Sequence, residues 1–260
     1  MRKILVFLIL GIGLGFLSVL HASENTLTFV ISPPPIGYPE FEKGVRDYSA
    51  GGNFIYARTK LQDTTLNVLG ATGFMNYQEC PYSKLAFSGN VNGGFLIGNK
   101  YDLTLWLLSI QPSVAYQIDL SPTFSMFLIG GVGMEVSITT MTVEIPQVIN
   151  SLITIDPTTV YTTQAVYHPT IGLQINMEMG SFIFSPFGMY TYTTGSYWVE
   201  QKSAMSFTYP SFSGNLDAFS STVIGFDLLY KPFGVSLSSL THFRPDTTLL
   251  SIALKWLLSR

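Results

Sequence analysis

Few residues in this sequence combine types and positions that could support catalysis. Glu135 and His168 form the strongest candidate pair, because a carboxylate that orients an imidazole is a recognised part of hydrolytic sites. Hydrolysis would also require a nucleophile, and neither Ser137 nor Thr170 lies in a nucleophile motif. We therefore assign no catalytic residue, and the simpler interpretation of Glu135 and His168 is a polar contact inside the fold.

A second group of candidates is charged and consists of Asp119, Glu178, Asp227 and Lys255. Charges inside a confined space are costly to bury, so pairing or hydration is expected. Such a cluster could be a path for protons or ions. We favour the alternative, a network that rigidifies one end of the fold.

Metal and cofactor chemistry have little support in the sequence. One of the three histidines, His21, lies in the N-terminal segment, and the other two lack the spacing of metal ligands. The single cysteine, Cys80, cannot form an intrachain disulfide, and we expect it to be a turn residue before Pro81. We predict no metal and no cofactor.

The elements that must position these candidates are β-strands, because the hydrophobic pattern has a period of two. From Ser109 to Leu120 apolar residues occupy the even positions, whereas polar or small residues occupy the odd ones. The same alternation recurs over 85–97, 167–179 and 249–258. On this pattern Glu135 and His168 both point to the polar face, at similar heights on neighbouring strands.

The composition indicates that the apolar faces do not face water. Charged residues make up 11% of the chain, whereas about 25% is usual for a soluble domain, and the mean hydropathy is +0.34. The mild acidic excess, with 16 Asp and Glu against 13 Lys and Arg, also argues against a nucleic-acid partner.

The N-terminal segment has the features of a signal peptide. Arg2 and Lys3 precede a long uncharged apolar run, and Ala22 is a small residue suited to cleavage. We predict a signal peptide over 1–22, a Pro-rich periplasmic lead-in over 23–44 and a single β-domain over 45–260. The length of the apolar run leaves an uncleaved membrane anchor as an alternative.

The β-domain is predicted to contain about ten strands, although eight or twelve are also compatible with the pattern. The predicted ranges are 45–58, 64–77, 85–98, 103–120, 123–138, 166–180, 182–194, 219–231, 234–243 and 247–258. With the N-terminus in the periplasm, short turns alternate with longer outer connections, of which 139–165 and 195–218 are the longest. Several strands span about 12 residues or more, which is long for a soluble β-sandwich but sufficient for a tilted strand to cross a membrane.

Taken as a whole, the pattern over the mature region resembles the outer-membrane β-barrel superfamily. The resemblance implies an antiparallel transmembrane β-barrel in the bacterial outer membrane, with membrane lipid and the outer-membrane assembly machinery as partners. Aromatic side chains are expected at the two membrane surfaces, among them Tyr190, Tyr192 and Trp256.

The expected function is that of a cell-envelope protein acting as a surface scaffold, a binding protein or a narrow pore, with an unknown ligand. Two alternatives remain at this point. One is an outer-membrane hydrolase that uses Glu135 and His168, and the other is a secreted, soluble β-sandwich.

Overall fold

The computed structural model of this 260-residue chain describes residues 44–61, 64–149, 152–205, 208–244 and 247–259. The described part forms ten strands and one short 3₁₀ helix. They are β1 (Arg46–Leu61), β2 (Thr64–Tyr82), β3 (Leu85–Gly98), β4 (Thr104–Ser121), β5 (Phe124–Ile149), β6 (Leu152–Met179), β7 (Phe182–Ser203), β8 (Phe212–Tyr230), η1 (Lys231–Phe233), β9 (Val235–Phe243) and β10 (Thr247–Ser259). The predicted signal peptide, and the lead-in except its last residue, lie outside the described residues. Among the described residues, no helix has the length and apolarity that a transmembrane span requires.

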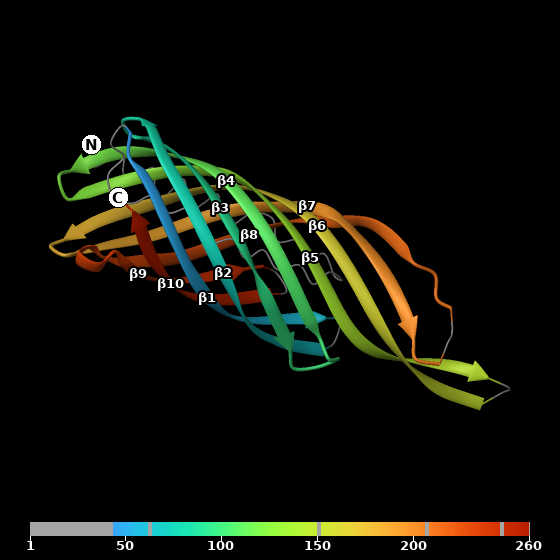
Figure 1. Cartoon of the computed structure of the whole chain (residues 1–260). Coiled ribbons are helices and arrows are strands. Elements are labelled where there is room, and N and C mark those ends of the chain that lie inside the picture. Colours follow the sequence, from blue (N-terminus) through green and yellow to red (C-terminus); the bar gives the residue numbers. More distant parts are fainter. Residues whose placement is uncertain (1–43, 62–63, 150–151, 206–207, 245–246, 260) are drawn as a thin grey trace.

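The strands form one closed antiparallel barrel (Figure 1). Each strand pairs with its neighbours in the chain, and β1 closes the sheet by pairing with β10. Closure satisfies the hydrogen-bonding groups that an open sheet edge would expose. The predicted ten-stranded barrel is therefore confirmed, and the alternative of a two-sheet sandwich is wrong.

The two ends of the barrel differ in their connections. Short links at 83–84, 122–123, 180–181 and 231–234 lie at the end where β1 begins and β10 ends. We call this the turn end. At 231–234 the chain reverses through η1, and Gly234 has a φ of 61°, a left-handed conformation that glycine adopts without steric cost.

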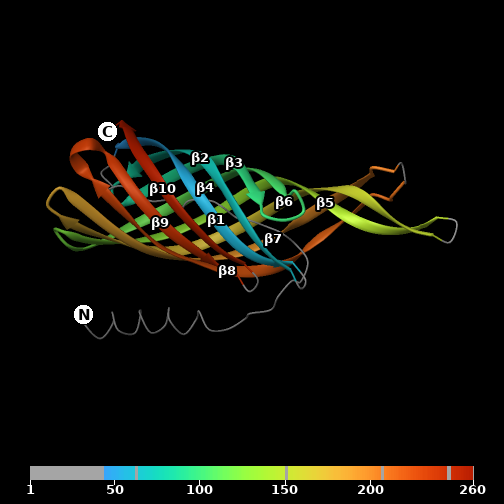
Figure 2. The same cartoon turned by 90° about the horizontal axis from the view of Figure 1, so that it is seen from below.

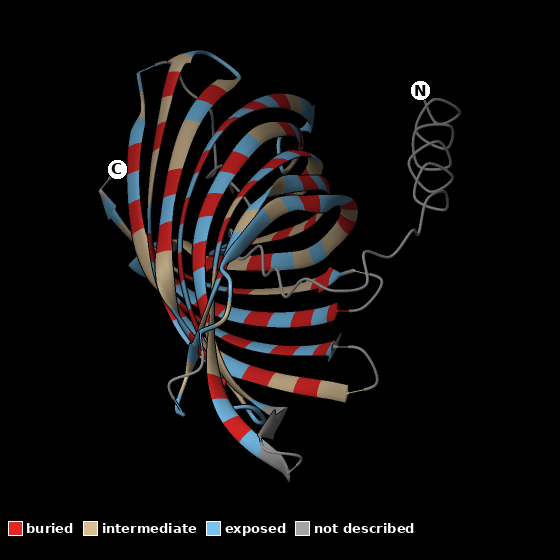
Figure 3. Ribbon diagram, turned by 90° about the vertical axis from the view of Figure 1, so that its right-hand side faces the viewer, coloured by how far each residue is buried: buried red, intermediate tan, exposed pale blue. Residues whose placement is uncertain are grey.

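Burial alternates along the strands, as the period of two predicted (Figure 3). In β4 the odd residues from Leu105 to Gln117 are buried in the lumen, whereas most even residues are exposed on the outside. The exposed set includes Trp106 and Ile110, at 59% and 47%. The barrel is thus apolar outside and largely polar inside, the reverse of a soluble domain.

Three strands continue beyond the rim at the opposite end (Figures 1 and 2). β5 and β6 contain 26 and 28 residues, and their pairing continues without a break from Phe124–Met177 to Ile149–Leu152. β4 pairs with β5 only as far as Thr140. We call the parts beyond this register the outer extension; it comprises 141–149, 152–160 and 201–203, with the connection 204–211.

The outer extension corrects the predicted connections. Most of 139–165 was expected to be a loop but is strand, and β7 and β8 likewise occupy most of 195–218. A second correction concerns Cys80, which lies within β2 with its side chain fully buried rather than in a turn. The strand continues past Pro81 because the pairing of β2 with β3 shifts register between Glu79 and Tyr82.

Candidate functional site

Glu135 and His168 both enter the lumen from adjacent strands. They are 2% and 1% exposed, and β5–β6 pairing sets Glu135 beside Val166 and His168 beside Gly133. The two side chains are therefore one diagonal step apart. The His168 imidazole lies across Gly133, where an added Cβ would overlap the ring, and its Nε2 has no hydrogen-bond partner among the described residues.

This arrangement depends on a glycine opposite a bulky lumen side chain. The same device recurs elsewhere in the described strands: for example, the Phe74 ring lies over its partner Gly51, and the Phe187 ring lies over its partner Gly225. A side chain at any of these glycines would meet the ring within 3 Å. Large side chains thus alternate with glycines around the barrel, which lets a narrow lumen be filled.

The buried position of Glu135 and His168 gives no support to hydrolysis. A general base must reach its substrate, directly or through one water, and neither side chain is accessible from outside. The described residues also contain no group of three or more His, Cys, Asp or Glu arranged to hold a metal ion. A carboxylate and an imidazole in this position can polarise the interior and bind water.

The four charged candidates do not form one cluster; they belong to three separate ion pairs. Asp119 pairs with Lys84 at 2.9 Å, Glu178 pairs with Lys231 at 3.1 Å, and Asp227 pairs with Lys255 at 3.6 Å. The first two pairs lie at the turn end and are partly exposed. Only the third lies deep in the lumen.

Lys84 and Lys231 escaped the sequence analysis for a physical reason. Both lie in turns, where the period of two no longer fixes the direction of a side chain. The nearby Asp119 carboxylate accepts a hydrogen bond from Lys84 and raises the pKa of that ammonium group. Lys84 lay between two predicted strands and Lys231 was the last residue of the predicted strand 219–231. The signal in the sequence was that each lysine lies at the same end of the barrel as the acidic residue with which it pairs.

The Asp227–Lys255 pair is almost completely excluded from solvent, with side chains 0% and 8% exposed. Asp227 also accepts a hydrogen bond from the Ser238 hydroxyl on β9. β8, β9 and β10 are consecutive neighbours, so the pair spans two strands with the serine between them. Such a pair stabilises only while both charges remain.

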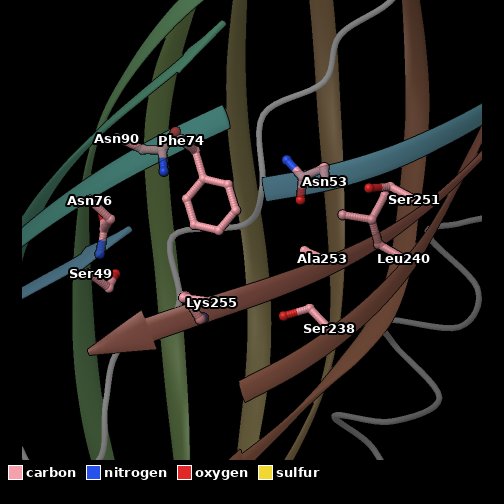
Figure 4. Close-up of a pocket in the computed structure, with 10 residues that line it drawn as sticks. All are labelled: Ser49, Asn53, Phe74, Asn76, Asn90, Ser238, Leu240, Ser251, Ala253 and Lys255. Carbon is pink, nitrogen blue, oxygen red and sulfur yellow. The ribbon is translucent and has the colours of Figure 1, made fainter. Parts of the chain in front are cut away.

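A small cavity with several polar side chains in its walls lies beside Lys255 (Figure 4). About 20 Å³ is open to the centre of a water-sized sphere, enough for one or two waters. The walls include Asn53, Asn76 and Asn90, whose buried Oδ1 atoms have no hydrogen-bond partner among the described residues. Water is the species that can donate to these oxygens.

Apolar side chains fill much of the remaining lumen in two clusters. One lies toward the outer extension on β1 to β4 and β10, and it includes Ile55, Leu105 and Leu249. The other lies toward the turn end, with Phe127 and Phe187 among its members. Leu240 packs against both clusters, so the two are linked near the middle of the barrel.

The outer extension contains its own buried carboxylate, Asp156, which the sequence analysis missed. Its side chain is 0% exposed and accepts hydrogen bonds from the Tyr209 hydroxyl at 2.7 Å, the Met205 amide at 3.2 Å and the Thr158 hydroxyl at 3.1 Å. Burial raises the pKa of Asp156, but the hydrogen bonds from Tyr209, Ser203, Thr158 and Met205 together hold it below its usual value. Asp156 thereby links Met205 and Tyr209 to β6.

The outward face carries the expected aromatic residues at both levels. Trp256 lies near the turn end and is 45% exposed, while Tyr190 and Tyr192 lie higher on β7 and are 38% and 47% exposed. Aromatic pairs join neighbouring strands, for example Phe95 with Trp106 at 5.5 Å between ring centroids. This distribution is typical of a membrane-facing surface.

Comparisons with known proteins identify the fold. The structure is similar to the outer membrane protease OmpT from Escherichia coli, with 10% identity, coverage of 82% of this chain and 96% of that chain, and a TM-score of 0.53. It is also similar to the translocator domain of autotransporter NalP from Neisseria meningitidis, with 8% identity, coverage of 82% and 87%, and a TM-score of 0.49. No family model and no curated protein matches the sequence. The chain has the fold of the outer-membrane β-barrels, as the sequence resemblance predicted.

Proposed function

We propose that this chain is a bacterial outer-membrane surface protein with a filled barrel, which acts as a scaffold or binding surface through its outer extension. The filled lumen is the observation that carries the proposal. Two apolar clusters and the Asp227–Lys255 pair occupy the interior, and the cavity beside Lys255 has room for only one or two waters. A solute would have to displace packed side chains.

The placement in the membrane is part of the proposal. The apolar outward face and its aromatic residues fit lipid, and a closed barrel leaves no unpaired sheet edge in the hydrocarbon. The proposal includes export by the signal peptide 1–22 with cleavage near Ala22, and insertion by the outer-membrane assembly machinery. The turn end then faces the periplasm, because short turns are typical of that side.

The outer extension supports a role at the cell surface. It continues the barrel wall as a ribbon of paired strands, and Asp156 holds Met205 and Tyr209 against that ribbon. A rigid, exposed platform of this kind suits recognition better than transport.

Conductance tests the filled lumen directly. Purified, refolded protein in a planar bilayer is expected to give no stable openings or only very small ones. Removing bulk from one cluster, by Phe127→Ala together with Phe187→Ala, should increase conductance because both rings fill the same part of the lumen. A matched control is Phe95→Ala, which removes a ring from the outward face. Large, stable openings of the unmodified protein, comparable to those of a general porin, would contradict the proposal.

Protease accessibility tests the orientation. Protease added to intact cells should cut within the connection 204–211, whereas the links at the turn end should be cut only after the outer membrane is opened. Protection of the outer connection in intact cells, with cleavage at the turn end, would reverse the proposed topology.

A further inference from the structure

Most basic side chains among the described residues have a partner. Arg46 pairs with Glu79, Lys84 with Asp119, Lys202 with Glu200, Lys231 with Glu178 and Lys255 with Asp227, and Arg244 stacks on the Phe219 ring at 3.7 Å. In the same part of the chain, three exposed cations have no ionic partner: Arg58, Lys60 and Lys100.

These three cations lie together at one edge of the barrel rim. Arg58 and Lys60 point outward two residues apart on β1, and Arg58 pairs across the sheet with Asn67 on β2. The Asn67 amide donates to Asn99 Oδ1 at 2.9 Å, and the Asn99 amide donates back to the Asn67 carbonyl at 2.9 Å. Lys100 follows Asn99, so all three cations surround the same β1–β3 corner, which we call the cationic patch.

The cationic patch lies directly above the apolar band of the same strands. Phe54 and Tyr56 precede Arg58 on the outward face of β1 and are 52% and 40% exposed, and Ile97 on β3 is 52% exposed. The Tyr56 hydroxyl donates to Asn67 Oδ1 at 3.1 Å, which links the band to the patch. From the turn end toward the rim, the outward surface of these strands therefore changes from apolar to aromatic to cationic.

We propose that the cationic patch binds the phosphate-bearing headgroup of a membrane lipid while the apolar band below it contacts the acyl chains. Guanidinium and ammonium groups are the side chains that recognise phosphate oxygens. A lipid is favoured over a free anion because Arg58 and Lys60 lie on the outward face of β1 and adjoin its exposed apolar residues. Asp102, in the same connection as Lys100, is exposed and pairs with none of the three among the described residues. The inference rests on the proposed membrane placement but not on the scaffold role.

Lipid retention by the purified barrel tests this inference. The refolded protein, in a neutral detergent, is titrated with phosphatidic acid or with phosphatidylcholine of the same acyl chains, and bound lipid is counted by native mass spectrometry. Phosphatidic acid should bind more tightly, and its binding should weaken as salt is added. The triple variant Arg58→Gln, Lys60→Gln, Lys100→Gln should lose roughly fivefold in affinity for each cation removed.

The matched control neutralises three exposed cations that already have acidic partners, by Arg46→Gln, Lys84→Gln and Lys202→Gln. This variant should bind phosphatidic acid almost as well as the unmodified protein does. An equal loss in both variants would overturn the inference, as would displacement of the lipid by inorganic phosphate at the same concentration.

The salt titration of the unmodified protein keeps the inference testable even if a variant fails to fold; binding that is insensitive to salt contradicts it. Equal binding of the two lipids would exclude the cationic patch as a phosphate site and leave the membrane placement intact. Failure to retain either lipid would instead count against the membrane placement itself.

Discussion

β6 has one part in the barrel and one part in the outer extension. Both parts show the same alternation of exposed and buried residues, but their surroundings differ. In the barrel, Ile171 points outward and is 67% exposed while its neighbour Thr170 lies in the lumen. In the outer extension, Ile155 is 55% exposed and its neighbour Asp156 is fully buried. The alternation is the same, but the barrel residues border the apolar outward face and a filled lumen, whereas those of the extension lie beyond the rim.

Two of the fully buried carboxylates in the described part of the chain differ in the same way. Asp227, in the barrel, is paired with a cation, Lys255. Asp156, in the extension, is held by neutral hydroxyl and amide donors. Loss of a partner should therefore disturb the whole barrel in the first case and one connection in the second.

The largest expected effect comes from breaking the buried pair. Lys255→Met leaves Asp227 uncompensated in the lumen and should lower the free energy of unfolding by about 3–5 kcal/mol. Lys84→Met removes a partly exposed pair at the turn end and should cost about 0–1 kcal/mol. Denaturant titrations of the refolded proteins in lipid measure both. The double variant Lys255→Met, Asp227→Leu should regain part of the loss; if it is no more stable than Lys255→Met, the charge is not the cause.

The next largest effect is expected from a charge on the outward face of β6, and it should depend on whether the charge lies in the barrel or in the extension. Ile171→Arg should destabilise by roughly 2–4 kcal/mol, because the charge would face the hydrocarbon. Ile155→Arg is the matched control, since it has the same residue type, strand and orientation but lies beyond the rim. It should change stability by less than about 0.5 kcal/mol. Equal effects in unfolding titrations would remove the distinction between barrel and extension.

A smaller effect is expected where the lumen packing is tight. Gly133→Ala would place a methyl group against the His168 ring, and such overpacking typically costs about 1–3 kcal/mol. Gly130→Ala on the same strand has open space around the new Cβ and is the control. The same unfolding titrations apply. A Gly133→Ala variant as stable as the control would show that the imidazole moves away without cost.

The barrel was predictable from the sequence because each of its strands separates two media. The period of two therefore identified the faces, and it placed Glu135, His168 and Asp227 inside, where they lie. The outer extension lies beyond the apolar outward face of the barrel, and its strands lack a regular apolar face. Its strand pairing could not be read from 139–165, where Thr is frequent.

The candidate site was predictable only in part. Direction along a strand is set by the backbone, so the lumen positions of Asp227 and Lys255 followed from the sequence, whereas Asp119 and Glu178 lie partly exposed at the turn end. The pairing of these charges depends on the side chains in the turns and on the register between strands. The alternation of residues along a single strand determines neither of them. The glycine partners of His168, Phe74 and Phe187 required register in the same way.

The smallest expected effect on the barrel comes from Asp156, and it should be confined to the extension. Asp156→Asn removes the charge that holds Met205 and Tyr209, so the connection 204–211 should be cut faster by protease while barrel unfolding is unchanged. Because hydrogen bonds hold the pKa of Asp156 below its usual value, the anchor is complete at neutral pH and is lost as the pH falls through that lowered pKa. The Met205 amide chemical shift, followed by NMR, should report this titration directly. In Asp156→Asn, the pH dependence of that shift should disappear. Asp217→Asn, an exposed substitution on β8, should leave the titration in place. A midpoint above the usual range of an aspartate would mean that burial outweighs the hydrogen bonds, and the extension would then hold its connection by packing rather than by charge.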